Sequence, residues 1–451
     1  MTTPRLYYIE KPNLSLLNDK DEKQISELFR DDKIRGLFEK ANSPDYLYFD
    51  KLKYKIPNYG ISPEEGWLAV RTFRNLIANN TIIKAKEGGF FKWIRLSYTD
   101  EYLHRIDMYA GGKIMSRSFS SSDENQLIVH GIMEEAIASS QLEGAHTTRA
   151  AAKKMLLEGK VPKNNSEQMI LNNYKAITAI KSEYTKYELS LDLMFTLHRQ
   201  LTEGTDIEKD QIGRLRVDSD DIVVQGDIGT EKYITHVPPN EAFLKQEMER
   251  LIAFANDKDS NQFIHPVVKA IFLHFWIGYL HPFADGNGRI ARALFYWYLL
   301  KKGYQTIMYV PISIVIKSAP MQYAMAYIYS EQDNFDLTYF YDFHIKKIIQ
   351  ALEEFESYID RKTKENHKLD DVLGIQISLN DRQKQLLHHL ISDDKASITV
   401  TSHSGIHNIA RQTGAKDLKE LENKGFIISK REGKFIKYYP SDKLQALKDQ
   451  I

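Results

Sequence analysis

The 451-residue chain contains no cysteine, which excludes disulfides, thiolate nucleophiles, iron–sulfur clusters and cysteine-ligated zinc. It also has no net charge, with 61 basic and 61 acidic residues, so a nucleic-acid or lipid surface could only be met by a local patch. The longest apolar stretch, around Ala270–Leu280, is far shorter than the ~20 residues that span a bilayer, and the N-terminal sequence lacks the features of a secretory signal. We therefore expect a soluble, cytoplasmic protein that makes no membrane contact.

Ordinary proportions of apolar and charged residues make up the chain, with 42% apolar, 27% charged and 11% aromatic. These values are typical of a globular protein, and at roughly 100–200 residues per domain the length predicts two to four domains. Helical periodicity dominates the middle of the chain, so the expected fold class is mainly α. Helices are predicted over Pro63–Asn79, Glu124–Glu143, Asn164–Tyr187, Leu191–Glu203, Asn240–Asn256, His265–Leu280, Arg289–Lys302 and Leu337–Arg361.

Changes in composition divide the chain into four zones. Residues 1–105 mix short aromatic segments with turn signals and predict a small mixed α/β domain, in which we find no chemistry. Residues 106–365 form the helical zone. The polar stretch Arg361–Asp371 marks a linker, placed at 366–378, before a C-terminal domain over 379–451.

The most informative segment is His281–Arg292, with the sequence HPFADGNGRIAR, where one apolar helix ends and another begins. Backbone N–H groups around Gly286 and Gly288 can converge there, and the next helix adds the positive end of its dipole, so the segment favours an anion. Arg289 and Arg292 lie three positions apart on the first turn of that helix, so both guanidinium groups can reach the same anion.

Two further side chains in this segment suggest catalysis. Asp285 would repel a bare phosphate but becomes useful where a divalent cation bridges it to phosphate oxygens. His281 titrates near neutral pH, which suits a general base. Gly-Asn-Gly alone is more often a turn, and His-Pro alone is more often a helix end, but their combination in one segment favours the catalytic interpretation.

The segment matches the pattern His-Pro-Phe-x-Asp-Gly-Asn-Gly-Arg-x-x-Arg in full, and the chain resembles the Fic family of nucleotide-dependent protein modifiers over about Ser122–Lys347. The resemblance implies a Fic-type helical core that moves AMP from ATP to a Ser, Thr or Tyr hydroxyl of a target protein, or of itself, and releases pyrophosphate. It implies that His281 takes the hydroxyl proton and that Asp285 holds Mg²⁺. By the same resemblance the phosphates are held by Gly286, Asn287, Gly288 and Arg289, with the γ-phosphate on Arg292. In-line phosphoryl transfer needs mainly alignment and charge neutralisation, with one base, so the chemistry agrees with the resemblance.

A second segment, Ser139–Gly144 (SSQLEG), resembles the Ser/Thr-x-x-x-Glu-Gly/Asn signature of the family's inhibitory helix, here at about 124–143. Its place upstream of the core resembles the subclass that carries this helix on the N-terminal side. The resemblance implies that Glu143, with Ser139 opening the signature, pairs with Arg292. A carboxylate there would occupy the place of the γ-phosphate, so ATP would bind in a poor orientation for attack. The alternative is a solvated acid at the end of a helix.

Two β-type runs around a turn at Gly226–Gly229 predict a hairpin within Asp220–Pro239. By resemblance this hairpin, preceded by Gly213–Arg216 (GRLR), takes the position of the family's flap. A strand edge can accept an extended target segment by backbone pairing; a purely structural hairpin is the alternative. Tyr323 falls where relatives often show a Tyr-Tyr pair near the adenine, but Gln322 stands at the first position, and a core tyrosine is the alternative.

Other sequence patterns carry less chemistry. His403 and His407 are four apart, but they flank Ser404-Gly405 beside a Ser/Thr-rich stretch, Ser397–Ser404, which predicts a loop. His274 lies in an apolar helix and is predicted to be a hydrogen-bonded core residue. The absence of a Gly-x-x-x-x-Gly-Lys-Ser/Thr loop excludes a P-loop NTPase.

The C-terminal zone has a modest basic excess. From Asp381 to Ile451 there are thirteen Lys and Arg against nine Asp and Glu. Two predicted helices followed by a predicted hairpin fit a winged-helix unit, and Arg411–Leu421 resembles the recognition-helix region of winged helix-turn-helix domains. In such domains that helix enters the major groove, and basic wing residues, here Lys430, Arg431 and Lys434, meet phosphate. The alternative is a winged helix that serves dimerisation or protein docking.

Together these observations predict an ATP- and Mg²⁺-dependent protein adenylyltransferase that is restrained by Glu143. Two alternatives stay open. One is removal of AMP from a modified target, with Glu143 aligning water. The other is a DNA-binding regulator whose core only senses nucleotide, against which the intact His281 argues because binding alone needs no base. A homodimer is one option for the oligomeric state.

Overall fold

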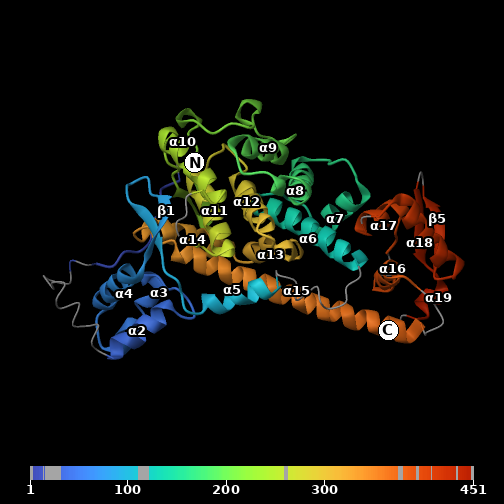
Figure 1. Ribbon diagram of the computed structural model, residues 1–451, viewed down its shortest axis with the longest axis horizontal. Helices are drawn as coiled ribbons and strands as arrows, with labels where there is room; N and C mark the ends of the chain where they lie inside the picture. Colours follow the sequence, from blue (N-terminus) through green and yellow to red (C-terminus); the bar gives the residue numbers. More distant parts are fainter. Residues whose placement is uncertain are drawn as a thin grey trace.

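The computed structural model shows a row of helices lying along one long helix, α15 (Thr338–Leu373; Figure 1). The N-terminal zone lies on the left of Figure 1 and the C-terminal zone on the right. The structure describes residues 4–13, 15, 32–109, 121–258, 263–373, 379–392, 396–407, 409–432 and 435–447. These residues are mainly α-helical and form three two-stranded antiparallel sheets, which confirms the expected fold class. None of the described helices combines the length and the apolar character that crossing a membrane requires.

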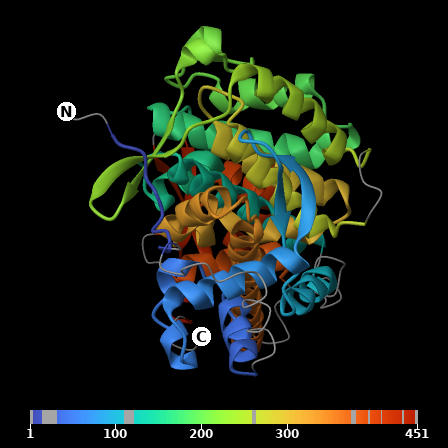
Figure 2. The same cartoon turned by 90° about the vertical axis from the view of Figure 1, so that its left-hand side faces the viewer.

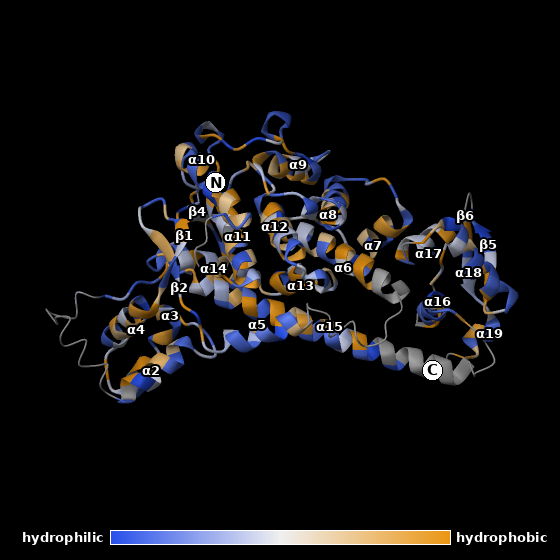
Figure 3. Ribbon diagram, viewed as in Figure 1, coloured by the Kyte–Doolittle hydropathy of each residue, from blue (hydrophilic) through white to orange (hydrophobic). Residues whose placement is uncertain are grey.

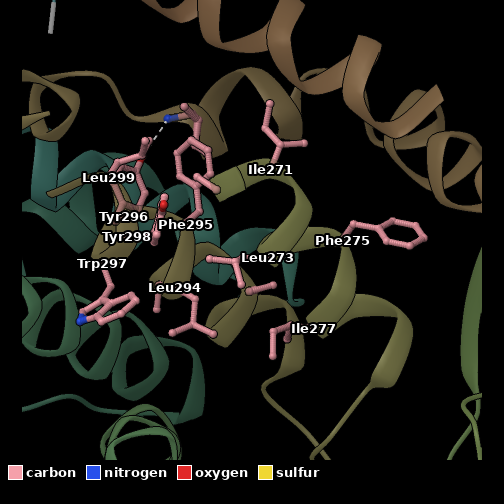
Figure 4. Packing of buried hydrophobic residues seen from close by; sticks show 14 of the residues in the cluster. Ile271, Leu273, Phe275, Ile277, Leu294, Phe295, Tyr296, Trp297, Tyr298 and Leu299 are labelled. Atoms are coloured by element: carbon pink, nitrogen blue, oxygen red, sulfur yellow. Dashed lines mark hydrogen bonds between the residues drawn. The ribbon is translucent and has the colours of Figure 1, made fainter. Parts of the chain in front are cut away.

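Two helices form the centre of the fold, α11 (Pro266–Leu280) and α12 (Asn287–Lys301), which pack against each other. Both are apolar around nearly their whole circumference, as interior helices are, and both bury a tryptophan completely, Trp276 and Trp297. Their side chains interdigitate in Figure 4. The helices packed around this pair are α6 (Ser121–Leu142), α8 (Asn165–Ser182), α9 (Leu191–Thr202), α10 (Glu241–Ala255), α13 (Ile312–Lys317) and α14 (Pro320–Gln332).

Helix α15 corrects the prediction of a linker that breaks the chain at Arg361–Asp371. The helix has 36 residues, which at ~1.5 Å per residue is about 54 Å, and it continues through that polar stretch. Its first half buries apolar side chains such as Phe340 and Ile345 in the central core. The polar composition of this stretch is therefore compatible with a helix. Residues 374–378 of the predicted linker lie outside the described ranges.

The N-terminal zone is mixed α/β and has a hydrophobic core of its own that also includes three residues of α14 and α15. Trp67 and Leu37 are buried there, and Arg74 lies over the ring of Tyr46 with its guanidinium 3.6 Å from the ring centre. The capping box between Ser62 and Glu65 starts helix α4. The elements are α2 (Asp32–Asn42), α3 (Phe49–Leu52), α4 (Pro63–Ile77), β1 (Asn79–Lys84), β2 (Phe90–Trp93) and α5 (Thr99–Met108).

A hairpin, which we call the flap, leaves the helical core between α9 and α10. Its strands are β3 (Val224–Ile228) and β4 (Glu231–His236), so the hairpin is confirmed. Of the predicted turn Gly226–Gly229 only Gly229 lies in the turn, because the three residues before it belong to β3. The N-terminal segment runs alongside the flap in Figure 2 and pairs with β4 in parallel. Tyr7 donates its N–H to the carbonyl of Ile234 at 2.9 Å, and Ile234 donates to the carbonyl of Arg5 at 2.9 Å.

The C-terminal zone forms a third hydrophobic core around Leu387, Leu418 and Phe426. Its elements are α16 (Asp381–Ser392), α17 (Val400–His407), α18 (Arg411–Asn423), β5 (Ile427–Glu432), β6 (Phe435–Pro440) and α19 (Asp442–Gln445). Helix α17 packs against α6 and against α7 (Arg149–Glu158). Helix α18 and strand β5 are predominantly hydrophilic (Figure 3).

The expected loop at Ser397–Ser404 is wrong, because α17 begins at Val400 and contains both histidines. His403 and His407 therefore do face each other, with their ring centres 4.7 Å apart. The acceptor that engages His403 is Asp417, at 3.2 Å from Nε2, and Arg382 binds the same carboxylate. Among the described residues no group of three or more acids and histidines could hold a metal ion. The short 3₁₀ helices are Ile56–Tyr59, Tyr184–Lys186, Lys209–Gln211, Asp218–Asp220 and Gln305–Tyr309.

Candidate active site

His281 stands at the C-terminal end of α11 in a left-handed backbone conformation, with φ 47° and ψ 59°. Such a conformation is uncommon for a residue with a side chain, and it persists only where the surroundings hold it. The N–H of His281 still donates to the carbonyl of Ile277 at 2.8 Å, so the helix is closed and the chain turns sharply into the loop.

The ring of His281 is held in its neutral form. Burial is the main cause that lowers the pKa of His281 to about 3, and the neighbouring His236 and Arg216 act in the same direction. A hydrogen bond with the backbone of Gly278 opposes these effects without cancelling them. A neutral imidazole at neutral pH can accept a proton, as a general base must.

Arg216 fixes the backbone on which His281 sits. Its Nε donates to the carbonyl of His281 at 2.7 Å, and its N–H donates to the carbonyl of Pro282 at 2.9 Å. One terminal nitrogen donates to the carbonyls of Leu280, at 3.2 Å, and Pro239. The side chain of Arg216 thus donates its hydrogen bonds to main-chain oxygens around the turn. These bonds connect the segments before and after the flap to the end of α11.

The loop between α11 and α12 is shaped from within by Asn287. Its side-chain oxygen accepts from the N–H of Phe283 at 2.9 Å, and its amide donates to the carbonyl of Phe283 at 2.8 Å. Gly286, with φ 83°, precedes the first residue of α12 and takes a conformation that glycine adopts without strain. The Asn287 side chain is therefore engaged in closing the loop, and only its backbone N–H remains to face an anion.

Asp285 points outward from this loop, with 56% of its side chain exposed. One carboxylate oxygen accepts from the N–H of Gly286 at 2.6 Å and the other lies 3.1 Å from Arg289. A cavity of about 310 Å³ adjoins both Asp285 and Arg289. One exposed carboxylate that keeps free lone pairs is a donor that Mg²⁺ accepts beside phosphate oxygens and water.

His198 of α9 holds the other side of the loop. The N–H of Gly213 donates to its Nδ1 at 2.9 Å, so Nε2 carries the hydrogen and donates to the carbonyl of Asp285 at 3.0 Å. Its ring stacks on Phe283 with centres 4.1 Å apart. Burial is the main cause that lowers the pKa of His198 to about 4, so this bridge is made by a neutral ring.

Arg292, on the first turns of α12, is buried and faces α6. Its Nε donates to Oγ of Ser139 at 2.7 Å, and one terminal nitrogen donates to the carbonyl of Ser139 at 3.0 Å and to Glu143 at 2.9 Å. Arg289, although it lies close in sequence, points elsewhere, to the carbonyl of Leu201 at 3.0 Å and to Asp285. The two arginines therefore flank the start of α12. We had expected them to converge on one anion, but in the structure their guanidinium groups point to different partners.

The carboxylate of Glu143 lies directly over the start of α12. A methyl group placed on Gly288 would come within 2.1 Å of Oε1 of Glu143 and 3.1 Å of Arg292. The negative charge thus sits at the positive end of the helix dipole, where an anionic ligand would bind. Glu143 is partly exposed at 26%, whereas Arg292 is 2% exposed.

Helix α6 ends at Leu142, directly before Glu143, and is anchored two turns earlier by Glu135. This fully buried carboxylate accepts from the hydroxyl of Tyr296 at 2.9 Å and from the N–H and hydroxyl of Ser313. Burial raises the pKa of Glu135, and these hydrogen bonds oppose the rise. The anchor fixes α6 against α12 and α13 and so fixes the height at which Glu143 meets Arg292.

Comparison with known proteins agrees with this geometry. Residues 188–299, which include His281 and Arg292, match the model of the Fic/DOC family. The chain contains a Fic domain. Among curated proteins, the chain is 30% identical over 185 residues to the protein adenylyltransferase Fic of Drosophila grimshawi. The matched region covers 41% of this chain and 34% of that protein. The chain is also 27% identical over 216 residues to the protein of the same name from Drosophila mojavensis, covering 48% and 39%. The chain thus spans little more than a third of the length of these relatives.

Solved structures with a similar arrangement include a Fic family protein from Desulfovibrio desulfuricans, with 18% identity, 76% of this chain and 96% of that chain covered, and a TM-score of 0.47. Another is Fic-1 from C. elegans, with 14% identity, 78% and 91% covered, and a TM-score of 0.49.

The Fic motif and the inhibitory signature meet in space as the sequence predicts, but Tyr323 takes a different setting. Its hydroxyl lies 3.0 Å from Nε2 of His274, and its ring packs beside Tyr327 and Phe340. His274 is fully buried with this hydrogen bond, which confirms its prediction as a core residue. An adenine contact by Tyr323 stays a prediction.

Sequence reasoning missed the functional contacts of His198 and Arg216. Arg216 could have been found, because it closes the Gly213–Arg216 segment that precedes the flap, but its target is main-chain oxygen, which no sequence pattern specifies. His198 gave no signal, because a single histidine in an amphipathic helix has no characteristic spacing.

Proposed function

We propose that the protein transfers AMP from ATP to a hydroxyl group of a protein and releases pyrophosphate. The observation that carries the proposal is the meeting of His281, the start of α12 and Arg292 at one junction between helices, with a carboxylate resting where an anion would bind. The substrates are ATP and a Ser, Thr or Tyr side chain of a target protein or of the protein itself.

His281 is the general base in this proposal. Its neutral imidazole accepts the proton of the target hydroxyl, and the hydroxyl oxygen attacks the α-phosphorus of ATP. The bond to the bridging oxygen breaks, and pyrophosphate leaves with the electron pair. Arg216 keeps the backbone of His281 in place while this occurs, since its donors bind the carbonyls around the turn.

The phosphates lie along the start of α12, where the backbone N–H groups of Asn287 and Gly288 and the helix dipole neutralise charge. Arg289 lies at one side of this site, and Arg292 receives the γ-phosphate on the other. Mg²⁺ would bind Asp285, whose exposed carboxylate fits it, and would supply charge neutralisation at the phosphates.

Glu143 restrains the reaction in this proposal, since it holds the donors of Arg292 that the γ-phosphate requires. ATP that binds beside the carboxylate is displaced from the line of attack, and transfer loses the alignment on which it depends.

The test uses ATP labelled at the α-phosphate and the full chain. We expect weak self-labelling by wild type, strong self-labelling by Glu143→Gly, and none by Glu143→Gly combined with His281→Ala. Mass spectrometry of cell extract treated with Glu143→Gly then identifies the modified side chains. Absence of label from Glu143→Gly in both self-modification and extract would remove the proposal.

The same contact supports the reverse reaction as a second candidate. Glu143 is partly exposed beside the phosphate site, so its carboxylate could align a water molecule against a phosphodiester. An AMP-modified target would then lose its label with wild type and keep it with Glu143→Gly.

The C-terminal zone supports a further proposal, a winged helix that contacts DNA. The exposed side of α18 carries Arg411, Lys416 and Lys419, and the exposed strand β5 carries Lys430 and Arg431. Lys434 of the predicted wing lies outside the described residues. We expect duplex DNA to bind in a salt-dependent manner, with the slope reduced by about one ion for each lysine lost in Lys416→Glu and Lys419→Glu. Lys51→Glu, on α3, is the matched control, and equal binding by all variants would assign this surface to another partner.

A further inference from the structure

His236, the last residue of the flap strand β4, is held at both ring nitrogens. Its Nδ1 lies 2.6 Å from a carboxylate oxygen of Glu331 in α14, and its Nε2 lies 2.8 Å from the carbonyl oxygen of Tyr279 in α11. The side chain is 7% exposed and that of Glu331 is 16% exposed, so water does not replace these contacts.

Both partners of the ring are acceptors. A carbonyl oxygen has no hydrogen to give, and a carboxylate has none while it is ionised, so each ring nitrogen must supply one. A ring with hydrogen on both nitrogens is an imidazolium, and its positive charge is matched by Glu331. Charge-assisted hydrogen bonds of this kind are about twice as strong as neutral ones.

The position of this ring links the flap to the candidate base. Tyr279 lies two residues before His281, at the end of the helix that presents it. Arg216 ties the segment before the flap to the same helix end, and His236 ties the segment after it, so both ends of the flap are joined to the turn that carries His281.

The charged and titratable groups around His236 come from three elements. Glu331 faces it from α14, Tyr279 and His281 face it from the end of α11, and Lys86 reaches the neighbouring carbonyl of Val237 from the β1–β2 turn. Glu87 stands beside Lys86 at 3.9 Å. The positive charge of His236 also contributes to lowering the pKa of His281.

We propose that His236 is a positioning residue: as an imidazolium between Glu331 and the carbonyl of Tyr279, it fastens the flap to the helix end that presents His281. The inference rests on the proposed transfer reaction, in which the flap aligns the target segment with the base. We call these two contacts the latch; both need a ring hydrogen, so a ring with hydrogen on only one nitrogen cannot make both.

The first experiment does not depend on any transfer activity. The full chain with ¹⁵N-labelled histidine is examined by NMR, and the signal of His236 is assigned by its loss in His236→Gln. We expect the shifts of a doubly protonated ring at neutral pH and their loss in Glu331→Gln. Shifts of a neutral tautomer in the wild-type protein at neutral pH, including the arrangement in which Glu331 holds the proton, would overturn the proposal.

Amide exchange measures whether the latch holds the flap. We expect residues 224–236 to exchange at least about tenfold faster in His236→Gln, with the thermal midpoint nearly unchanged. His265→Gln is the matched control, since His265 also faces a carboxylate, Asp107 at 3.0 Å, but lies at the start of α11. Equal exchange in His236→Gln and His265→Gln would overturn the proposal.

Self-labelling with α-labelled ATP then connects the latch to the reaction, in the Glu143→Gly background. We expect His236→Gln and Glu331→Gln each to label about tenfold more slowly than the parent, with unchanged ATP affinity. A loss of ATP affinity in step with the labelling rate would assign His236 a purely structural role, and that result, or labelling equal to the parent's, would overturn the proposal. Failure of the parent to label removes the transfer function, while NMR and amide exchange still decide the latch.

Discussion

The contact between Glu143 and Arg292 predicts how the protein distinguishes ATP from ADP. In the wild-type protein the terminal nitrogen of Arg292 that would bind the γ-phosphate is already engaged by Glu143 at 2.9 Å. ATP and ADP should therefore bind with nearly equal affinity. In Glu143→Gly that nitrogen is released, while Ser139 still orients the guanidinium through Nε at 2.7 Å.

The size of the change follows from the type of contact. Arg292 is buried, and a hydrogen bond between charged groups contributes roughly 1.5–3 kcal/mol. A free energy of that size corresponds to an affinity ratio of about 10 to 150. We expect Glu143→Gly to bind ATP more tightly than ADP by a factor in this range, whereas wild type shows a ratio near one.

Isothermal titration with ATP and with ADP, both in the presence of Mg²⁺, measures the two ratios. Glu183→Gly is the matched control, because Glu183 also stands at the end of a helix, α8, but is exposed and remote from Arg292. An ATP-to-ADP ratio that is the same in wild type and Glu143→Gly would refute the reasoning, whatever happens to the labelling activity.

Other substitutions test single parts of the site. His281→Ala, in the Glu143→Gly background, should lower the labelling rate by about 10²–10⁴-fold with little change in ATP affinity, and an unaltered rate would exclude this base. Gly288→Ala should lower the thermal midpoint of wild type, because its methyl group meets Glu143 at 2.1 Å, and the loss should largely vanish in Glu143→Gly; a loss of equal size in both backgrounds would contradict the contact. His198 is neutral in the fold with a pKa of about 4, while an unfolded histidine binds a proton near pH ~6.5, so its contribution is complete above that pH and is lost as the pH falls toward 4. Between pH 7 and pH 5 the free energy of unfolding should therefore fall by about 2 kcal/mol less in His198→Gln than in wild type, as urea titrations would show; equal pH dependence would argue against a neutral ring.

The sequence predicted the parts of the fold that depend on local pattern. The apolar character of α11 can be read from consecutive positions, and the predicted helix His265–Leu280 differs from the observed Pro266–Leu280 by one residue. The junction of His281 with Arg292 followed from a short motif that covers the loop after α11 and the first turns of α12. Glu143 was found because its signature is also local, although its partner is 149 positions away.

What the sequence could not predict depends on distant partners. The polar end of α15 has no apolar face to reveal a helix, and helix α17 contains a Ser-Gly pair that local propensity assigns to a loop. The hydrogen bonds of Arg216 and one of the two ring contacts of His236 are made with main-chain carbonyl oxygens, which every residue possesses. The divergence of Arg289 from Arg292 is set by Leu201 and Ser139, which come from two different helices.

Glu143 and Arg292 belong to one chain, so in the proposed function the carboxylate competes with nucleotide as a tethered neighbour. Its local concentration does not change when the protein is diluted, and even short flexible tethers give values of the order of millimolar. Here a helix anchored through Glu135 holds the acid in register, which makes that local concentration higher still. If the proposed function holds, a higher nucleotide concentration therefore relieves this competition less than a displacement of α6 does, and we expect a regulator to act on that helix.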